Sequence, residues 1–342
     1  MQHDISHNII VALTWIYVNK IFFDLHFYIL IVILELHNIT VQMAGEKMEI
    51  IKVKGNTYCI DTGMTYLPFY KLNNKDIILM DSGYQKECEG IEEALEKDNL
   101  RIKTIICSHA HPDHIGNNAY FKGKYNCKIA MTRDEAYICA SFANFKSFYD
   151  QPMSLLKSYY KNLIHETDII INEKQDNIIL DDIVFKLFHT FGHSPDQICI
   201  TTPDDVCYLA DSLITHETMA GTKIPYAFVL KDDLKSKKSL NQLYSSKYII
   251  THKGISNDIE ALIEDNIEYY GGMAQSVYEE ISKPMTFEDI LKCIIRKFNM
   301  EVKSVYKYKM AERMLRSNVE YLYDTGKVDT IIDNCFIKYV RK

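Results

Sequence analysis

Three histidines and an aspartate lie within six positions of the sequence CSHAHPDHIGN, residues 107 to 117. The preceding residues 101 to 108, RIKTIICS, form a short apolar run that predicts a buried strand. His109 and His111 are two residues apart at the end of that strand, so their side chains point the same way and can bind one ion. The motif therefore predicts a metal site at the carboxyl end of a strand, which is where open α/β sheets bind ligands.

The next two polar residues predict a second ion beside the first. Asp113 and His114 come one turn later and face a position a few ångströms away. Imidazole and carboxylate together suit Zn²⁺, with Mn²⁺ and Fe²⁺ as rivals. These four ligands make half of a site for two metals, so further ligands are expected at other strand ends.

Three later strand ends carry suitable side chains. His193 lies in the loop sequence TFGHSPDQ, Asp211 directly follows the strand of CYLADSL, and His252 directly follows the strand of YIITHKG. Each follows an apolar run that predicts a strand. The three side chains are therefore expected to meet the histidine motif at one edge of the fold.

The remaining pattern predicts alternating strands and helices from Met48 onward. Short apolar runs separated by Gly, Asn and Asp predict a β-meander, then a helix, a strand and the motif. Residues 133 to 166 have a helical pattern rich in aromatic residues. Most of these aromatics are expected to pack in the core, although an inserted lid that walls a substrate pocket would also use them.

The order and context of the ligands resemble the metallo-β-lactamase superfamily over about residues 48 to 255. The resemblance implies an α/β fold, the αββα sandwich, and a site for two metals, Zn²⁺ with Mn²⁺ or Fe²⁺ as alternatives. It assigns His109, His111 and His193 to the first metal, and Asp113, His114 and His252 to the second, with Asp211 bridging. Asp81, in LMDSG, matches the family's early aspartate, which supports the ligands without binding metal.

The resemblance also implies hydrolysis by a hydroxide between the two metals, which Asp113 can orient as well as ligate. The second ligand is His111 rather than Glu, which is unlike the oxygen-reducing di-iron branch, and Asp211 replaces the cysteine of common β-lactamases. We expect a small-molecule ester or thioester as substrate. The alternatives are an endoribonuclease that hydrolyses RNA phosphodiesters and a non-catalytic metal-binding scaffold.

Residues 283 to 342 differ from the rest in charge and pattern. They hold 13 Lys and Arg against 8 Asp and Glu, an excess of +5, so residues 1 to 282 carry −12. Two helices are expected, the first capped by Thr286 and the second ended by Gly326, followed by a two-stranded ribbon. This layout resembles the winged-helix domain of one subgroup of the superfamily, which includes β-lactamase-like endoribonucleases.

The second of these helices carries a cluster of basic residues: Lys303, Lys307, Lys309, Arg313 and Arg316. It could be a phosphate-binding face or a solvated face of a module for packing or homodimer formation. The acidic remainder of the chain favours the solvated face, so RNA is the less favoured partner.

Residues 1 to 47 are strongly apolar, but Lys20, Asp24 and His26 interrupt them before a membrane span is complete. We expect an enzyme that begins near Met48, with residues 1 to 47 an extension that stems from an early start codon or acts as an anchor, and membrane association is not favoured. The expected domains are 48–282, catalytic, and 283–342, winged-helix-like. Nine scattered cysteines without a C-x-x-C pair predict reduced thiols and a cytoplasmic protein.

Overall fold

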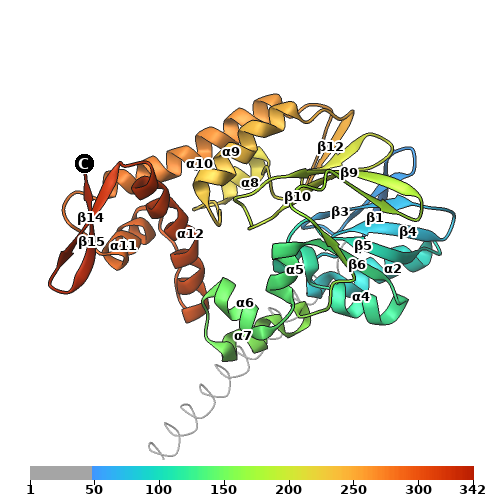
Figure 1. Ribbon diagram of the computed structural model, residues 1–342, viewed down its shortest axis with the longest axis horizontal. Coiled ribbons are helices and arrows are strands. Elements are labelled where there is room, and N and C mark those ends of the chain that lie inside the picture. Colours follow the sequence, from blue (N-terminus) through green and yellow to red (C-terminus); the bar gives the residue numbers. More distant parts are fainter. Residues whose placement is uncertain (1–47) are drawn as a thin grey trace, which may run out of the picture. The chain divides into compact units, whose positions relative to one another are not determined.

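The structure is a computed structural model that describes residues 48–342, which form one compact unit. Two β-sheets pack face to face, and helices cover their outer faces (Figure 1). These four layers are the αββα sandwich that the resemblance implies. The interpretations of residues 1–47 as an anchor or an early start lie outside the described residues.

The first sheet has seven strands in sequence order. β1 to β4 form the predicted antiparallel meander, and β5 to β7 then add in parallel. The sequence analysis missed β6 and β7. The strands are β1 (Glu49–Lys54), β2 (Thr57–Asp61), β3 (Tyr66–Lys71), β4 (Asp76–Met80), β5 (Arg101–Ile106), β6 (Lys128–Thr132) and β7 (Ile169–Ile171).

The second sheet has six strands in the order β13-β12-β11-β10-β9-β8. Only β11 and β12 pair in parallel, so their carboxyl ends meet at one edge of the sheet. The strands are β8 (Asn177–Leu180), β9 (Ile183–His189), β10 (Ile198–Thr201), β11 (Val206–Tyr208), β12 (Lys247–Ile250) and β13 (Gly254–Ser256).

Alternation along the strands builds two cores. In β4, Ile77 and Leu79 join the core beneath the first sheet, whereas Ile78 and Met80 join the core between the sheets. Successive side chains of a strand point to opposite faces, so a strand buried on both faces is apolar throughout. This is why the run DIILM contains no polar residue after Asp76.

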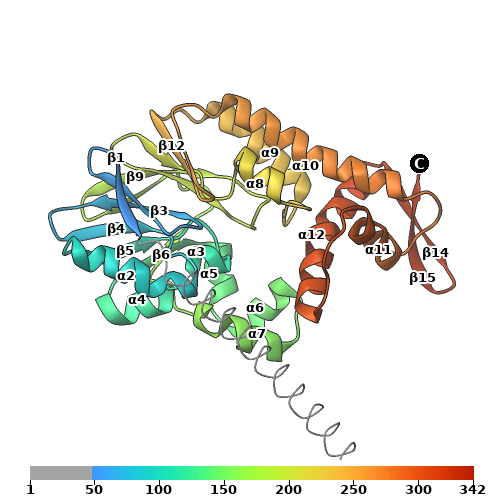
Figure 2. The same ribbon diagram turned by 180° about the vertical axis from the view of Figure 1, so that it is seen from behind.

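Helices cover the sheets on both sides (Figures 1 and 2). α2 (Cys88–Lys97), α4 (Asn118–Tyr125) and α5 (Arg133–Cys139) cover the first sheet, and α8 (His216–Gly221), α9 (Leu230–Ser239) and α10 (Glu260–Glu280) lie outside the second. The predicted helical stretch 133 to 166 consists of several short helices. The chain turns at Asp150, whose φ is +45°, between α6 (Phe142–Tyr149) and α7 (Met153–Tyr160). The single-turn helices are η1 (Gln85–Glu87), α3 (Pro112–Ile115), η2 (Lys161–Leu163) and η3 (Leu240–Gln242).

The C-terminal region has the predicted order of two helices and a hairpin: α11 (Phe287–Lys297), α12 (Val305–Asp324), β14 (Val328–Asp333) and β15 (Phe336–Arg341). Thr286 caps α11 by accepting a hydrogen bond from the Asp289 backbone N–H at 3.2 Å, and Gly326, with φ +72°, follows the end of α12. Residues of α10 share the apolar cluster of α11 and α12. The winged-helix assignment and the boundary after residue 282 stay predictions.

Within residues 48–342, none of the helices combines the length and the apolar character that a membrane span requires.

Candidate metal centre

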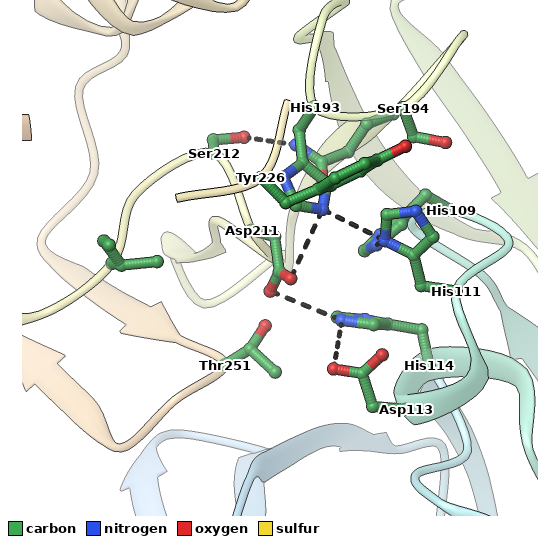
Figure 3. A network of polar contacts seen from close by, with 12 residues as sticks. His109, His111, Asp113, His114, His193, Ser194, Asp211, Ser212, Tyr226 and Thr251 are labelled. Atoms are coloured by element: carbon green, nitrogen blue, oxygen red, sulfur yellow. Dashed lines mark hydrogen bonds and ion pairs between the residues drawn. The ribbon is translucent and has the colours of Figure 1, made fainter. Parts of the chain in front are cut away.

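The histidine motif lies where the sequence places it, in the turn between β5 and α3. His109 and His111 come from the loop, while Asp113 and His114 lie on α3, which starts at Pro112. Proline suits the first turn of a helix because its missing N–H would have no partner there. His109 Nε2 is 2.9 Å from His111 Nδ1, so the two rings converge on one point (Figure 3).

The loops after β9 and β11 bring two more side chains to this point. His193 lies in the loop between β9 and β10, and Asp211 follows β11 by three residues. His193 Nε2 is 3.1 Å from His111 Nδ1 and 3.4 Å from Asp211 Oδ2. Asp211 Oδ1 in turn lies 3.3 Å from His114 Nε2 (Figure 3).

The side chains form two groups, each compact enough to bind an ion. In each group the ligand atoms lie within 4.8 Å of one another, and Asp211 belongs to both: His109, His111, His193 and Asp211 in one, Asp113, His114 and Asp211 in the other. His252 follows β12 at the rim of the second group. Its Nε2 lies 3.7 Å from both Asp113 Oδ2 and Asp211 Oδ2, so the structure brings all seven predicted ligands together.

The first group consists of neutral imidazoles. Burial and the neighbouring histidines hold the pKa values of His109 and His111 well below the usual range, and burial lowers the pKa of His193 to about 4. A neutral ring keeps a lone pair, which metal binding requires. These three side chains are therefore ready to ligate at neutral pH.

The second group attracts positive charge. Burial acts to lower the pKa of His114, but the carboxylates of Asp211 and Asp113 outweigh it and raise that pKa well above the usual range. Burial acts to raise the pKa of Asp211, but His114 and His252 hold it well below the usual range. His114 Nε2 and Asp211 Oδ1 are buried and face each other as an ion pair at 3.3 Å, but neither atom makes a hydrogen bond among the described residues. A divalent cation would satisfy both atoms, so the residues fit a metal.

Asp81 holds the cluster from behind, as the resemblance implies. It follows β4 with φ +62°, and its Oδ2 lies 2.7 Å from His114 Nδ1. The same carboxylate accepts hydrogen bonds from Ser108 and from the hydroxyl of Tyr208, each at 2.7 Å. The bond to Nδ1 leaves Nε2 of His114 directed at Asp113 and Asp211.

A buried carboxylate that the sequence analysis missed connects the two histidine loops. Glu135 of α5 accepts hydrogen bonds from the Ala110 N–H at 2.8 Å, the Ser194 hydroxyl at 2.5 Å and the Asp196 N–H at 2.9 Å. Burial raises the pKa of Glu135 to about 7. Glu135 fixes the loop that carries His109 and His111 to the loop that carries His193, and no local motif marks it.

The loop before His193 depends on a glycine. Gly192 has φ +117°, and a β-carbon built there would lie 1.9 Å from the backbone N of Asp233 in α9. The loop sequence Thr190-Phe191-Gly192-His193 therefore has glycine at the one position where the close approach to α9 requires it.

A cavity of about 460 Å³ opens beside the cluster. His111, Asp113 and Asp211 line one side of it, and α12 contributes Met310 and Arg313 to its wall. The interpretation of the basic helix as a solvated face is therefore wrong for Arg313, which faces the cavity.

Aromatic side chains form much of the remaining wall. The ring of Tyr226 lies 5.2 Å from the ring of His111 and 5.4 Å from that of His193, and the sequence analysis did not single it out. Tyr149 and Tyr160, from the aromatic stretch, are buried and also line the cavity. This stretch therefore contributes both to the core and to the pocket.

Three further histidines have partners away from the cluster. His189 Nδ1 is 2.8 Å from Asp196 Oδ1, His216 Nε2 is 2.7 Å from Asp265 Oδ2, and His165 Nδ1 is 2.9 Å from the carbonyl of Leu163. These contacts account for them without a catalytic role.

With this fold and site, the chain belongs to the metallo-beta-lactamase superfamily, whose family model matches residues 51–252. That range contains all seven predicted ligands.

Curated relatives are distant. The chain is similar to a hydroxyacylglutathione hydrolase of Pelagibacter ubique, with 26% identity over 161 residues, which are 47% of this chain and 53% of the relative. A hydroxyacylglutathione hydrolase of Rhodopseudomonas palustris (strain HaA2) is 27% identical over 123 residues, 36% of this chain and 38% of that one. The chain thus spans about half or less of the length of these relatives.

Solved structures share the fold over more of the chain. A metallo-beta-lactamase family protein from Thermus thermophilus superimposes with a TM-score of 0.63 at 17% identity, covering 86% of this chain and 98% of that one. A beta-lactamase domain protein from Burkholderia ambifaria gives 0.63 at 15% identity, covering 86% and 93%. These shares exceed residues 51–252, so the likeness of fold extends beyond the range of the family model.

Proposed function

We propose that the chain is a hydrolase that binds two zinc ions and cleaves an ester or thioester of a small molecule. The observation that carries this proposal is the pair of ligand groups that share Asp211 and open onto a cavity of about 460 Å³. A cavity of this size suits a small ligand.

The two groups support a division of the ligands between the two ions. His109, His111 and His193 would hold one ion, Asp113, His114 and His252 the other, with Asp211 between them. Nitrogen and carboxylate donors without thiolate suit zinc, with manganese and iron as rivals. When bound, such a pair of ions lowers the pKa of a water and polarises the carbonyl oxygen of a substrate.

The chain's own residues then position the water and the substrate. Asp113 Oδ2 lies 3.5 Å from His114 Nε2 and 3.7 Å from His252 Nε2, and its side chain is 14% exposed, at the cavity. It can orient a water there and accept its proton. Water adds to the carbonyl carbon, a C–O bond forms, the C–S or C–O bond to the leaving group breaks, and the leaving thiol or alcohol takes up a proton.

The relatives support a thioester. Their name, hydroxyacylglutathione hydrolase, denotes the hydrolysis of an acyl derivative of glutathione, which is a thiol. All nine cysteines are free, which supports a reducing compartment such as the cytoplasm.

A hydrolysis screen of the zinc-loaded protein tests the proposal. We expect turnover of small thioesters or esters, and loss of turnover in Asp113→Asn, which retains the shape of the side chain. Cleavage of single-stranded RNA with no action on esters would favour the endoribonuclease instead. Bound metal with no turnover of thioesters, esters, lactones, β-lactams or RNA would favour the metal-binding scaffold.

A further inference from the structure

We propose that Arg313 of α12 binds a carboxylate of the substrate, so that the enzyme selects esters or thioesters that carry a second, negatively charged group. This inference rests on the proposed function and names its substrate class. It makes the C-terminal helix part of the substrate site.

Arg313 and the metal cluster face the same cavity. Metal-ligand candidates His111 and His193 line it on one side, and Arg313 lines it from α12. Tyr226 lies between them: its ring is 5.2 Å from the ring of His111 and 4.9 Å from the guanidinium carbon of Arg313. A short molecule can therefore reach both the cluster and the guanidinium.

The guanidinium is held in place before any ligand arrives. Its carbon lies 4.2 Å from the ring centroid of Tyr149 and 4.4 Å from that of Phe148. Its Nε and Nη2 donate to the hydroxyl of Tyr226 at 3.0 and 2.5 Å. A preorganised donor loses little conformational entropy on binding, and the planar fork of arginine matches a carboxylate.

The charge of Arg313 lacks a carboxylate partner within residues 48–342. Lys309 pairs with Glu312 at 2.7 Å, and Arg316 pairs with the same carboxylate at 3.3 Å. Asp150 lies 3.8 Å from Lys309. Arg313 takes part in none of the ion pairs of the described residues, although its side chain is half-buried.

An unpaired cation at a half-buried position attracts an anion from solution. Lys86 adds a second positive charge at the cavity, over the ring of Tyr84. The substrate carboxylate would accept the N–H groups of Nη1, which donate to no residue of the described chain. The aromatic wall excludes water and strengthens this charge-assisted bond.

Three matched thioesters test the inference with the zinc-loaded enzyme. S-ethyl butanethioate is neutral, S-ethyl monothiosuccinate carries a carboxylate on the acyl side, and S-butanoyl-3-mercaptopropionate carries it on the leaving group. We expect the wild type to prefer one charged substrate. Arg313→Gln should lower kcat/KM for that substrate by about 10- to 100-fold more than for the neutral substrate, which is the contribution of a hydrogen bond to a charged group.

Two further variants separate charge from structure. Arg313→Lys keeps the positive charge but loses the planar, bidentate guanidinium, so it should retain part of the preference for the charged substrate. Arg316→Gln removes a cation one turn along α12 that does not line the cavity, and it should leave the preference unchanged. An equal loss for all three substrates in Arg313→Gln would overturn the inference, because it would indicate only a structural role.

Calorimetry gives an answer that does not need turnover. We expect N-ethylsuccinamate or the corresponding amide of 3-aminopropionate to bind the wild type more tightly than N-ethylbutanamide, and Arg313→Gln to abolish the difference. Equal binding of charged and neutral amides by the wild type would overturn the role of Arg313. Lack of hydrolysis of every thioester, with the charged amide still preferred, would instead overturn the proposed function alone.

Discussion

At the scale of single residues, Asp211 connects the two ligand groups of the site. Its two oxygens face different partners: Oδ1 lies 3.3 Å from His114 Nε2 and Oδ2 lies 3.4 Å from His193 Nε2. One carboxylate therefore belongs to both ligand groups, and it is buried. A carboxylate placed between two bound cations would lower the repulsion between them.

Asp211→Ala should therefore reduce bound metal from about two ions per chain to one or fewer. Activity should fall by more than about 100-fold, because removing even a supporting residue behind a metal ligand costs 10- to 100-fold. Elemental analysis and steady-state kinetics of the purified variant check both expectations.

His189→Ala is the control for this experiment. His189 is bonded to Asp196 at 2.8 Å and lies outside both ligand groups. The His189→Ala variant should keep its bound metal and most of the activity of the wild type. Equal metal content in the two variants would contradict the bridging assignment.

At the scale of elements, the loop before His193 is fixed by its fit against α9. Gly192→Ala places a β-carbon 1.9 Å from a backbone atom at φ +117°, so either the loop or the helix must shift. We expect a loss of about 3 kcal/mol or more in the free energy of unfolding, measured by urea denaturation.

Gly123→Ala in α4 is the matched control. A β-carbon there meets no atom within 4 Å, and alanine favours a helix over glycine by roughly 0.5–1 kcal/mol. This variant should be as stable as the wild type or slightly more so. If both variants unfolded at the same urea concentration, the close approach of the loop to α9 would be wrong.

The segment between η2 and β7 carries a pH-dependent contribution to stability. His165 is buried, its Nδ1 lies 2.9 Å from the Leu163 carbonyl, and its Nε2 lies 3.2 Å from Asn118 Nδ2. Burial lowers the pKa of His165 to about 4. Since the unfolded chain takes up the proton near pH 6.5, stability is full above that pH and is lost as the pH falls toward 4.

The contribution of His165 over this range is about 3 kcal/mol. His165→Gln should therefore show a smaller loss of unfolding free energy between pH 7 and pH 4.5 than the wild type does. Urea denaturation at the two pH values measures the difference. The same loss in both proteins would rule out His165 as its source.

The parts of the site at strand ends could be predicted from the sequence, and the parts contributed by packing could not. His193, Asp211 and His252 each follow an apolar run. A strand that ends in a turn can be recognised from a short stretch of sequence, so the positions of these ligands could be predicted. Glu135, Tyr226 and Arg313 carry no such signal. Arg313 meets Tyr226 from 87 positions away, so only the packing of α12 brings it to the site.

The same distinction holds for the fold. The pattern of apolar runs and turn residues predicted the antiparallel meander and most of the second sheet. It did not predict the short strands β6 and β7, which lie beside helices and have brief apolar runs. Periodicity does not separate a buried strand of three to five residues from a helical turn.

At the scale of the whole molecule, charge decides between a small substrate and RNA. Residues 1 to 282 carry −12, and several of the basic residues are paired: Lys309 and Arg316 of α12 pair with Glu312. Lys303, which the sequence predicts on this helix, precedes it and pairs with Glu301 at 2.5 Å. Arg313 faces the cavity rather than an open surface. Lys303, Lys309 and Arg316 are therefore engaged by carboxylates, which reduces their capacity to bind phosphate, although the segment as a whole keeps its excess of +5.

We accordingly expect single-stranded RNA to bind weakly and with a shallow dependence on salt. A protein that neutralises phosphates shows a log–log slope of about −0.7 for each one on a single strand, because bound counterions are released. Fluorescence anisotropy with a labelled RNA from low to physiological salt measures the slope, in the wild type and in the double variant Lys303→Ala, Lys307→Ala. The variant should change neither the slope nor the turnover of a neutral thioester. A steep slope that the double variant flattens, together with a loss of RNA cleavage at unchanged thioester turnover, would show that α12 binds phosphate and would replace the small-molecule substrate with RNA.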